Sequence, residues 1–313
     1  AQALPSIQTV TGAIAPDDFG FVLPHEHVMS RFGPPANPRP SYDRQHIDRV
    51  VLPYLRYIRE LGVDTICECT AAYFGRRPEL LREISERSGL QILTNTGYYG
   101  AAGDRYVPEH AYSDTVRGLA ERWIEEAEEG INPSGIRPGF MKIGVDDGPL
   151  SEIDRKLVEA AAEAHRETGL TMAVHHSSAS EQAVPAEMDI LEAAGVHPSA
   201  WIWVHAQNVS SPEALEPALE AGGWVEFDGL AADTLDRHLT LVNAVRDAGY
   251  LDRILLSLDG NTYPGANRPI RHYDALMTAF LGQLGAAGYS DEEIQQLTVI
   301  NPREAFVPRV RPF

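Results

Sequence analysis

Short apolar segments alternate along the chain with longer segments in which apolar residues recur every three to four positions. Eight of the short segments have the length and apolar content of buried strands: 19–28, 63–70, 91–96, 139–145, 170–176, 201–205, 223–227 and 254–259. The longer segments have the period of amphipathic helices: 43–61, 78–88, 112–129, 151–168, 187–194, 212–221, 235–248 and 270–287. Residues 7–12 predict a short hairpin strand ahead of this alternation.

The alternation of strand and helix predicts the fold. Successive strand–helix–strand units form a parallel sheet, and eight such units favour a closed (β/α)8 TIM barrel, an α/β fold, over an open doubly wound sheet. No Gly-x-Gly-x-x-Gly follows the first strand, which argues against a dinucleotide-binding fold. No linker, low-complexity tract or block of charge divides the chain, so we expect a single domain that spans residues 1–313.

The composition narrows the classes of partner and location. The chain has 313 residues and a formal net charge of −19, which disfavours binding to nucleic acid and to anionic membranes. No apolar run is long enough to cross a membrane. Cys67 and Cys69 form no disulfide framework. The first residues contain no intact signal peptide, so we expect a cytoplasmic protein, and a periplasmic or secreted one after signal cleavage stays open.

The candidate chemistry lies at the ends of the predicted strands, where a TIM barrel forms its active site. Five strands carry residues of metal-site type there: His25, His27, Lys142, His175, His176, His205 and Asp259. His25 and His27 are two apart and share one face of their strand. Imidazole and carboxylate are ligands for zinc and related ions. One shared metal site explains the five strand ends better than five independent structural roles.

Lys142 is conspicuous because the chain contains almost no lysine. Of the 26 basic residues only Lys142 and Lys156 are lysines. A lysine that persists inside an apolar strand against this bias indicates a function at that position.

Several local motifs accompany these strand ends. They are Gly20-Phe-Val-Leu-Pro-His-Glu-His27, Gly75-Arg76, Thr96-Gly-Tyr-Tyr99, Gly135-Ile-Arg137 and Leu297-Thr-Val-Ile-Asn-Pro302. With these motifs the chain resembles the phosphotriesterase-like family of the amidohydrolase superfamily, from Thr9 to about Pro308.

The resemblance implies a binuclear metal centre. His25, His27 and Asp259 would hold the more buried of two divalent ions, and the histidines of the fifth and sixth strands would hold the more exposed one. Lys142, carboxylated by carbon dioxide to N6-carboxylysine, would bridge both ions. Zinc is the expected metal, with Co²⁺, Mn²⁺ or Fe²⁺ as alternatives. The resemblance also suggests a homodimer.

The fifth strand offers two adjacent histidines, and strand alternation lets only one of them face the metals. The family spacing from Gly169 selects His175, whereas Ser177 and the spacing back from Gly195 select His176. We prefer His175, because gaps belong in the loop after a strand rather than within it. By the same alternation Glu26 points away from the metals and is expected to support the barrel or the N-terminal loop.

The expected activity is hydrolysis. Two divalent ions make hydroxide available at neutral pH for attack on a carbonyl carbon or phosphorus, and Asp259 is placed to orient the hydroxide and transfer its proton to the leaving group. Tyr99 falls where lactonases of the family have a tyrosine, which favours a carboxylic ester, lactone or amide as the small-molecule substrate. A phosphotriesterase acting on organophosphate triesters is the alternative, and a non-catalytic metal-binding barrel is the second alternative.

Two departures from the family pattern and two arginines bear on the substrate. His205 is followed by Ala206-Gln-Asn208 where the family often has acidic residues, and Phe227-Asp-Gly229 lacks an arginine common in lactonases. Arg268 and Arg271 follow a short loop after Asp259. Each arginine could bind a carboxylate or phosphate of the substrate, or pair with surface acids instead.

Overall fold

Nine short parallel strands lie at the centre of the described structure. The computed structural model describes residues 5–177, 180–265 and 268–313. The strands are β3 (Val22–Glu26), β4 (Thr65–Glu68), β5 (Gln91–Leu93), β6 (Asn95–Thr96), β7 (Phe140–Val145), β8 (Met172–His176), β9 (Trp201–Val204), β10 (Trp224–Phe227) and β11 (Ile254–Leu256). They pair in two groups, β3-β4-β5 and β6-β7-β8-β9-β10-β11.

Hydrogen bonds between the carboxyl end of β3 and the residues just after β11 close the sheet into a barrel. The N–H of Asp259 donates to the carbonyl of His25 at 3.2 Å, and the N–H of His27 donates to the carbonyl of Gly260 at 3.0 Å. At the other junction the predicted strand 91–96 divides into β5, which pairs with β4, and β6, which pairs with β7. One interrupted strand therefore joins the two groups, and the predicted (β/α)8 barrel is confirmed.

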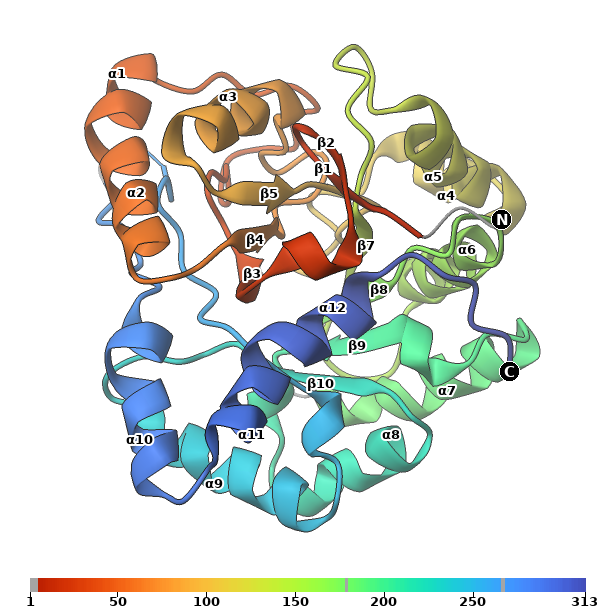
Figure 1. Ribbon diagram of the computed structural model, residues 1–313. Helices are drawn as coiled ribbons and strands as arrows, with labels where there is room; N and C mark the ends of the chain where they lie inside the picture. Colours follow the sequence, from red (N-terminus) through yellow and green to blue (C-terminus); the bar gives the residue numbers. More distant parts are fainter. Residues whose placement is uncertain (1–4, 178–179, 266–267) are drawn as a thin grey trace.

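Helices cover the outside of the barrel, as Figure 1 shows. Those between the strands and after the last strand are α1 (Arg44–His46), α2 (Leu52–Glu60), α3 (Pro78–Ser88), α4 (Glu109–Ser113), α5 (Val116–Glu129), α6 (Glu152–Thr168), α7 (Val184–Ala193), α8 (Glu216–Glu220), α9 (Leu235–Asp247), α10 (Leu281–Ala286), α11 (Asp291–Gln295) and α12 (Asn301–Phe306). The predicted segment 43–61 contains a π-helical turn, Ile47–Val51, between α1 and α2.

Two predicted helices differ from the observed ones for local reasons. The segment 112–129 is interrupted because Thr115 caps α5, its side chain accepting a hydrogen bond from the N–H of Gly118. The helix predicted from residue 270 begins only at Ala275. The preceding residues are extended, since Asn261 and Arg271 exchange two backbone hydrogen bonds of 2.8 and 2.9 Å. This pairing holds Arg271 beside the end of β11.

The amino-terminal end of the barrel is closed by the two ends of the chain. The predicted hairpin is present as β1 (Ile7–Thr9) and β2 (Gly12–Ile14), which pair antiparallel, and Figure 1 shows it with α12 across this end. Phe306 of α12 packs against Phe19 and Phe140, with ring centroids 6.2 and 5.3 Å apart. Cys67 and Cys69 are buried in the same interior cluster.

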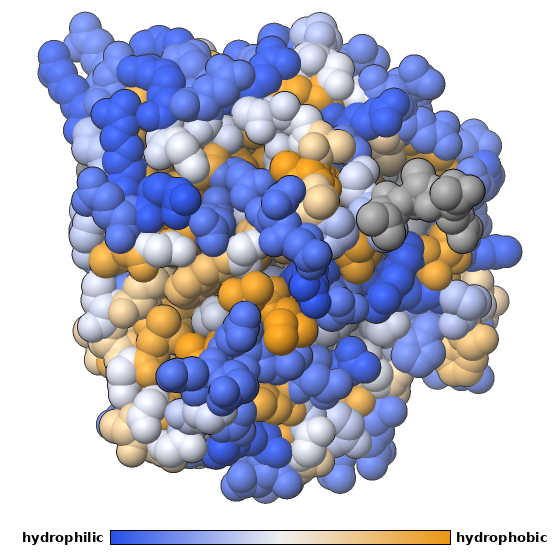
Figure 2. Space-filling model, viewed as in Figure 1, coloured by the Kyte–Doolittle hydropathy of each residue, from blue (hydrophilic) through white to orange (hydrophobic). Residues whose placement is uncertain are grey.

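The surface at this end is predominantly polar. Figure 2 shows hydrophilic residues over most of it, with hydrophobic residues in groups between them. Among the described residues no helix is both long enough and apolar enough to cross a membrane.

Candidate metal centre

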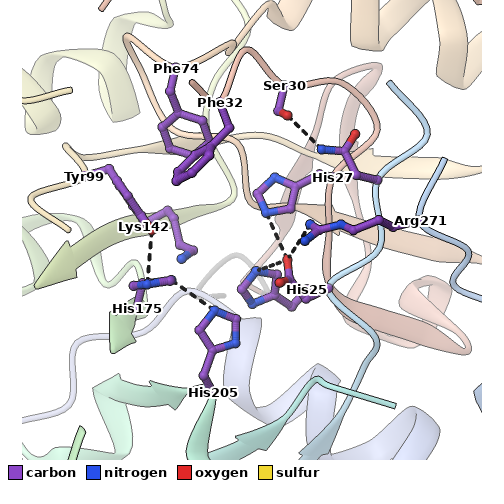
Figure 3. Close-up of a pocket in the computed structure, with 12 residues that line it drawn as sticks. His25, His27, Ser30, Phe32, Phe74, Tyr99, Lys142, His175, His205 and Arg271 are labelled. Carbon is purple, nitrogen blue, oxygen red and sulfur yellow. Dashed lines mark hydrogen bonds and ion pairs between the residues drawn. The ribbon is translucent and has the colours of Figure 1, made fainter. Parts of the chain in front are cut away.

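A cavity of about 230 Å³ lies at the carboxyl ends of the strands, opposite the closed end. It is lined by His25, His27, Ser30, Phe32, Phe74, Tyr99, Lys142, His175, His205, Asp259, Asn261 and Arg271. Figure 3 shows the histidine rings and the lysine directed toward a common centre. Six of the predicted metal-site residues therefore meet at one place, although they come from five different strand ends.

His25, His27 and Asp259 form one side of this centre. The Nε2 atoms of His25 and His27 lie 3.4 and 3.2 Å from Oδ1 of Asp259. The backbone of Asp259 is left-handed, with φ of 50°, a conformation that persists in a non-glycine residue only when its surroundings hold it.

Glu26 holds the turn that contains Asp259. Its two carboxyl oxygens accept hydrogen bonds from the N–H groups of Leu258 at 3.0 Å and Gly260 at 2.7 Å. Oε1 also accepts from the hydroxyl of Ser257 at 2.7 Å. Glu26 is fully buried and is not among the residues that line the cavity, so it positions Asp259 without reaching the centre itself.

His175 and His205 form the other side of the centre. Nε2 of His205 lies 3.0 Å from Nδ1 of His175, whose Nε2 lies 3.1 Å from the hydroxyl of Tyr99. His205, like Asp259, has a left-handed backbone, with φ of 63°. Asp228 holds it by accepting from both its N–H, at 3.1 Å, and its Nδ1, at 2.5 Å.

Each of the four histidines has one ring nitrogen in contact with a residue outside the cluster. Nδ1 of His25 contacts Oε1 of Glu226 at 2.8 Å, and Nδ1 of His27 contacts the hydroxyl of Thr70 at 2.7 Å. His205 uses Asp228 and His175 uses Tyr99 in the same way. The second nitrogen of each ring faces the other ligand-type side chains. Metal-binding histidines characteristically have such a partner, because it fixes the tautomer and the orientation of the ring.

The partners on or just after β10 and just after β4 were not anticipated from the sequence. Glu226 and Asp228 are two apart at the end of the seventh barrel strand, so alternation directs both toward the interior, and both are buried. Two carboxylates facing a barrel interior would be unstable without donors, and this signal could have identified them. Thr70 carries no comparable signal in the sequence.

The electrostatics keep three of the imidazoles neutral. Burial lowers the pKa of His25 to about 4 and also lowers the pKa values of His27 and His175. Burial acts in the same direction on His205, but the Asp228 carboxylate outweighs it and raises the His205 pKa. Although burial opposes ionisation of Asp259, His27 and His25 hold its pKa below the usual range. Neutral imidazole and ionised carboxylate are the forms that bind metals.

Lys142 extends from β7 into the same cavity and is almost completely buried. Its Nζ lies 5.8 Å from the ring centroid of Tyr99. Within the described ranges, none of the ion pairs includes Lys142. A buried amine without a carboxylate partner is costly, so this position suits a lysine with a functional role in the cavity.

One of the two candidate histidines of β8 and one of the two candidate arginines line the cavity. His176 points out of the barrel, and its Nε2 contacts Oε1 of Glu187 on α7 at 2.9 Å, so only His175 lines the cavity. Arg271 lines the cavity, with Nη2 3.5 Å from Oδ1 of Asp259. Arg268 is exposed and lies outside the cavity lining.

The donor set suits divalent metal ions. His25, His27 and Asp259 have ligand atoms within 4.8 Å of one another, as do His25, His205 and Asp228. Nitrogen and carboxylate donors of this kind bind zinc and its neighbours among the transition metals.

Comparison with known proteins agrees with this geometry. The family model described as "Phosphotriesterase family" matches residues 5–306. The phosphotriesterase homology protein of Escherichia coli is 27% identical over 305 residues, covering 93% of this chain and 99% of that protein. The N-acetyltaurine hydrolase of Xenopus tropicalis is 23% identical, covering 95% of this chain and 97% of that protein.

A solved structure shows the same overall arrangement. It comes from work on engineering organophosphate hydrolysis activity from a weak, promiscuous lactonase template. It is 27% identical to this chain, superposes with a TM-score of 0.84, and the match covers 96% of this chain and 99% of the other. From the family match over nearly its whole length, together with the shared barrel, the chain belongs to the phosphotriesterase family.

Proposed function

We propose that this protein is a metal-dependent hydrolase that uses two divalent ions, with zinc as the first choice and Co²⁺, Mn²⁺ or Fe²⁺ as alternatives. His25, His27 and Asp259 would hold the buried ion, His175 and His205 the exposed ion, and a carboxylated Lys142 both. The observation that carries the proposal is the convergence of these side chains on one cavity, with a partner for one ring nitrogen of every histidine.

The protein's own residues prepare the site for hydrolysis. Bound divalent ions supply Lewis acidity and make hydroxide available near neutral pH. Asp259 stays ionised and lies inside the cavity, so it can accept a proton and deliver it to a leaving group. Burial raises the pKa of Tyr99 above its usual range, which keeps its hydroxyl protonated as a hydrogen-bond donor.

The preferred substrate class is a carboxylic ester, lactone or amide. Tyr99 supports this class because its neutral hydroxyl lies at the cavity wall, beside His175, where it can donate to a substrate oxygen. Phe32 and Phe74 provide apolar surface beside Tyr99, with ring centroids 6.3 and 5.0 Å from its ring. A relative named as an N-acetyltaurine hydrolase adds an amide to the substrates of similar proteins. Phosphotriester hydrolysis is the second candidate, supported by the structural neighbour engineered for organophosphates.

A substrate screen tests the proposal. Zinc- and cobalt-loaded protein is assayed against lactones, aryl esters, N-acyl amides and paraoxon-type triesters. We expect turnover of at least one carbonyl class above the rate with triesters. Faster turnover of triesters selects the second candidate, and bound metal without turnover of any class selects a non-catalytic metal-binding barrel.

Lys142→Ala provides the matched control for the screen. We expect hydrolysis to be lost, because alanine cannot form the bridge, and to be partly restored by a short carboxylic acid added to the buffer. Full activity in this variant would contradict the bridging role of Lys142.

A further inference from the structure

Arg271 lies where two cavities meet. Apart from Lys142, it is the only lysine or arginine lining the metal-site cavity within the described part of the chain. It also lines a second cavity of about 570 Å³, bounded by the segments after β10 and β11. Asp259 borders both cavities as well. A ligand that extends from the metal-site cavity into the larger one therefore passes the guanidinium of Arg271.

The main chain of Arg271 is held in place, whereas its guanidinium makes one long contact. Two backbone hydrogen bonds with Asn261, of 2.8 and 2.9 Å, hold its main chain beside the barrel rim. The guanidinium contacts Oδ1 of Asp259 at 3.5 Å, and its side chain is 55% exposed. Charge-assisted hydrogen bonds are typically about 2.7–2.9 Å long, so this longer contact leaves most N–H groups of the guanidinium available to a ligand. Figure 3 shows the guanidinium directed toward the ring of histidines.

We propose that Arg271 binds an anionic group of the substrate, and that the preferred substrates are small amides or esters carrying a carboxylate. The inference rests on the proposed hydrolase function. Arginine presents a planar pair of donors that matches such anions. A metal ion held by Asp259 would replace this weak pairing and leave the guanidinium of Arg271 free for the ligand. Its closeness to Asp259 limits the spacer between the anion and the reacting carbonyl to a few bonds.

Arg271 is the one positive side chain of lysine or arginine type that a substrate in the second cavity would meet in the described ranges. The walls of this cavity are mostly small apolar residues, with Asp228 and Asp274 as acids in addition to Asp259. An anion entering from that side therefore meets one cation, next to the reacting centre. In a chain with a formal net charge of −19, such a local cation is needed to offset the repulsive field.

The test compares two amides of equal length that differ in charge. N-acetyl-β-alanine carries a carboxylate, and its primary amide, N-acetyl-β-alaninamide, is neutral. Both are assayed with the zinc-loaded wild type, Arg271→Ala, Arg271→Lys and the control Arg105→Ala. Arg105 is an exposed arginine on the loop after β6, where it donates to the carbonyl of Gly33 at 2.9 Å.

We expect the wild type to prefer the anionic amide by at least about tenfold in kcat/KM. In Arg271→Ala this preference falls by roughly 10- to 150-fold, mainly through KM, which corresponds to loss of one charge-assisted interaction. Arg271→Lys keeps the positive charge but lacks the planar pair of donors, so its preference for the anionic amide should lie between those of the wild type and Arg271→Ala. Arg105→Ala should match the wild type. An unchanged preference in Arg271→Ala, or no preference in the wild type, overturns the inference.

Calorimetry of the same zinc-loaded proteins separates this inference from the proposed function. If neither amide is hydrolysed, binding of N-acetyl-β-alanine that weakens at least tenfold in Arg271→Ala still supports the anion site. Absent binding, or equal binding in the two proteins, overturns it. Hydrolysis of neutral substrates alone leaves the proposed function intact and removes the anionic substrate class.

Discussion

Replacing Asp228 by asparagine should weaken metal binding strongly, although the two side chains are nearly equal in size. Oδ1 of Asp228 accepts from Nδ1 of His205 at 2.5 Å and from Nε2 of Gln207 at 2.8 Å. Oδ2 accepts from the N–H of His205 at 3.1 Å and lies 3.2 Å from Nδ1 of His25. Asparagine keeps the shape and one carbonyl oxygen. In either orientation of the asparagine amide, its NH₂ group would face N–H donors that one of the carboxylate oxygens of Asp228 accepts from.

The size of the effect follows from these contacts. A hydrogen bond to a charged group contributes about 1.5–3 kcal/mol, and Asp228→Asn removes the charge from both histidine contacts. Loss of the partner of a metal-bound histidine typically lowers metal affinity by about 10- to 100-fold, equal to about 1.4–2.8 kcal/mol. The two estimates agree, so we expect zinc affinity to fall by one to two orders of magnitude while both ions still bind at high concentration.

Competition with a chelating zinc indicator measures this affinity, and Glu187→Gln is the matched control. Glu187 is an equally buried carboxylate, it contacts His176 at 2.9 Å, and it lies outside the barrel. We expect both substitutions to lower the melting temperature, whereas only Asp228→Asn lowers zinc affinity. Equal zinc affinities in Asp228→Asn and the wild type would refute the assignment of His205 and His25 as ligands oriented from β10.

Two further variants test other parts of the structure. Glu26→Gln should lower zinc affinity at the buried site by about tenfold, because it disturbs an N–H acceptor beside Asp259; unchanged cobalt absorption and affinity would contradict this role. His165, whose pKa burial lowers to about 4, is neutral in the folded protein. The free energy of unfolding should therefore fall as the pH drops from about 6.5 to about 4, and it should fall less in His165→Gln than in the wild type. Urea unfolding at several pH values measures both curves, and parallel curves for the two proteins would contradict this.

The barrel could be predicted because its signals are local and repeated. Each apolar run and each amphipathic segment carries its own period, and a parallel sheet follows from their alternation. The errors occur where tertiary contacts override that period. The strand at 91–96 is interrupted because its two halves pair with different neighbours. The helix predicted from residue 270 is shortened by the pairing of Arg271 with Asn261.

The side chains at the centre of the site could also be anticipated, but which partner each of them contacts could not. His25, His27 and Asp259 end strands that a barrel must bring together. The choice between His175 and His176 depends on which face of β8 is interior, and only the contact of His176 with Glu187 on α7 shows this directly. Glu226 was overlooked because its role depends on the distance between β10 and β3 across the barrel.

Metal content tests the central claim most directly. The purified wild type, reconstituted with zinc and bicarbonate and then dialysed, is analysed by elemental mass spectrometry beside Lys142→Ala and Asp259→Asn. The proposed centre predicts about two zinc ions per chain in the wild type and fewer in both variants. Less than about one tightly held ion in the wild type, or equal metal content in all three proteins, would contradict a binuclear site at this cavity.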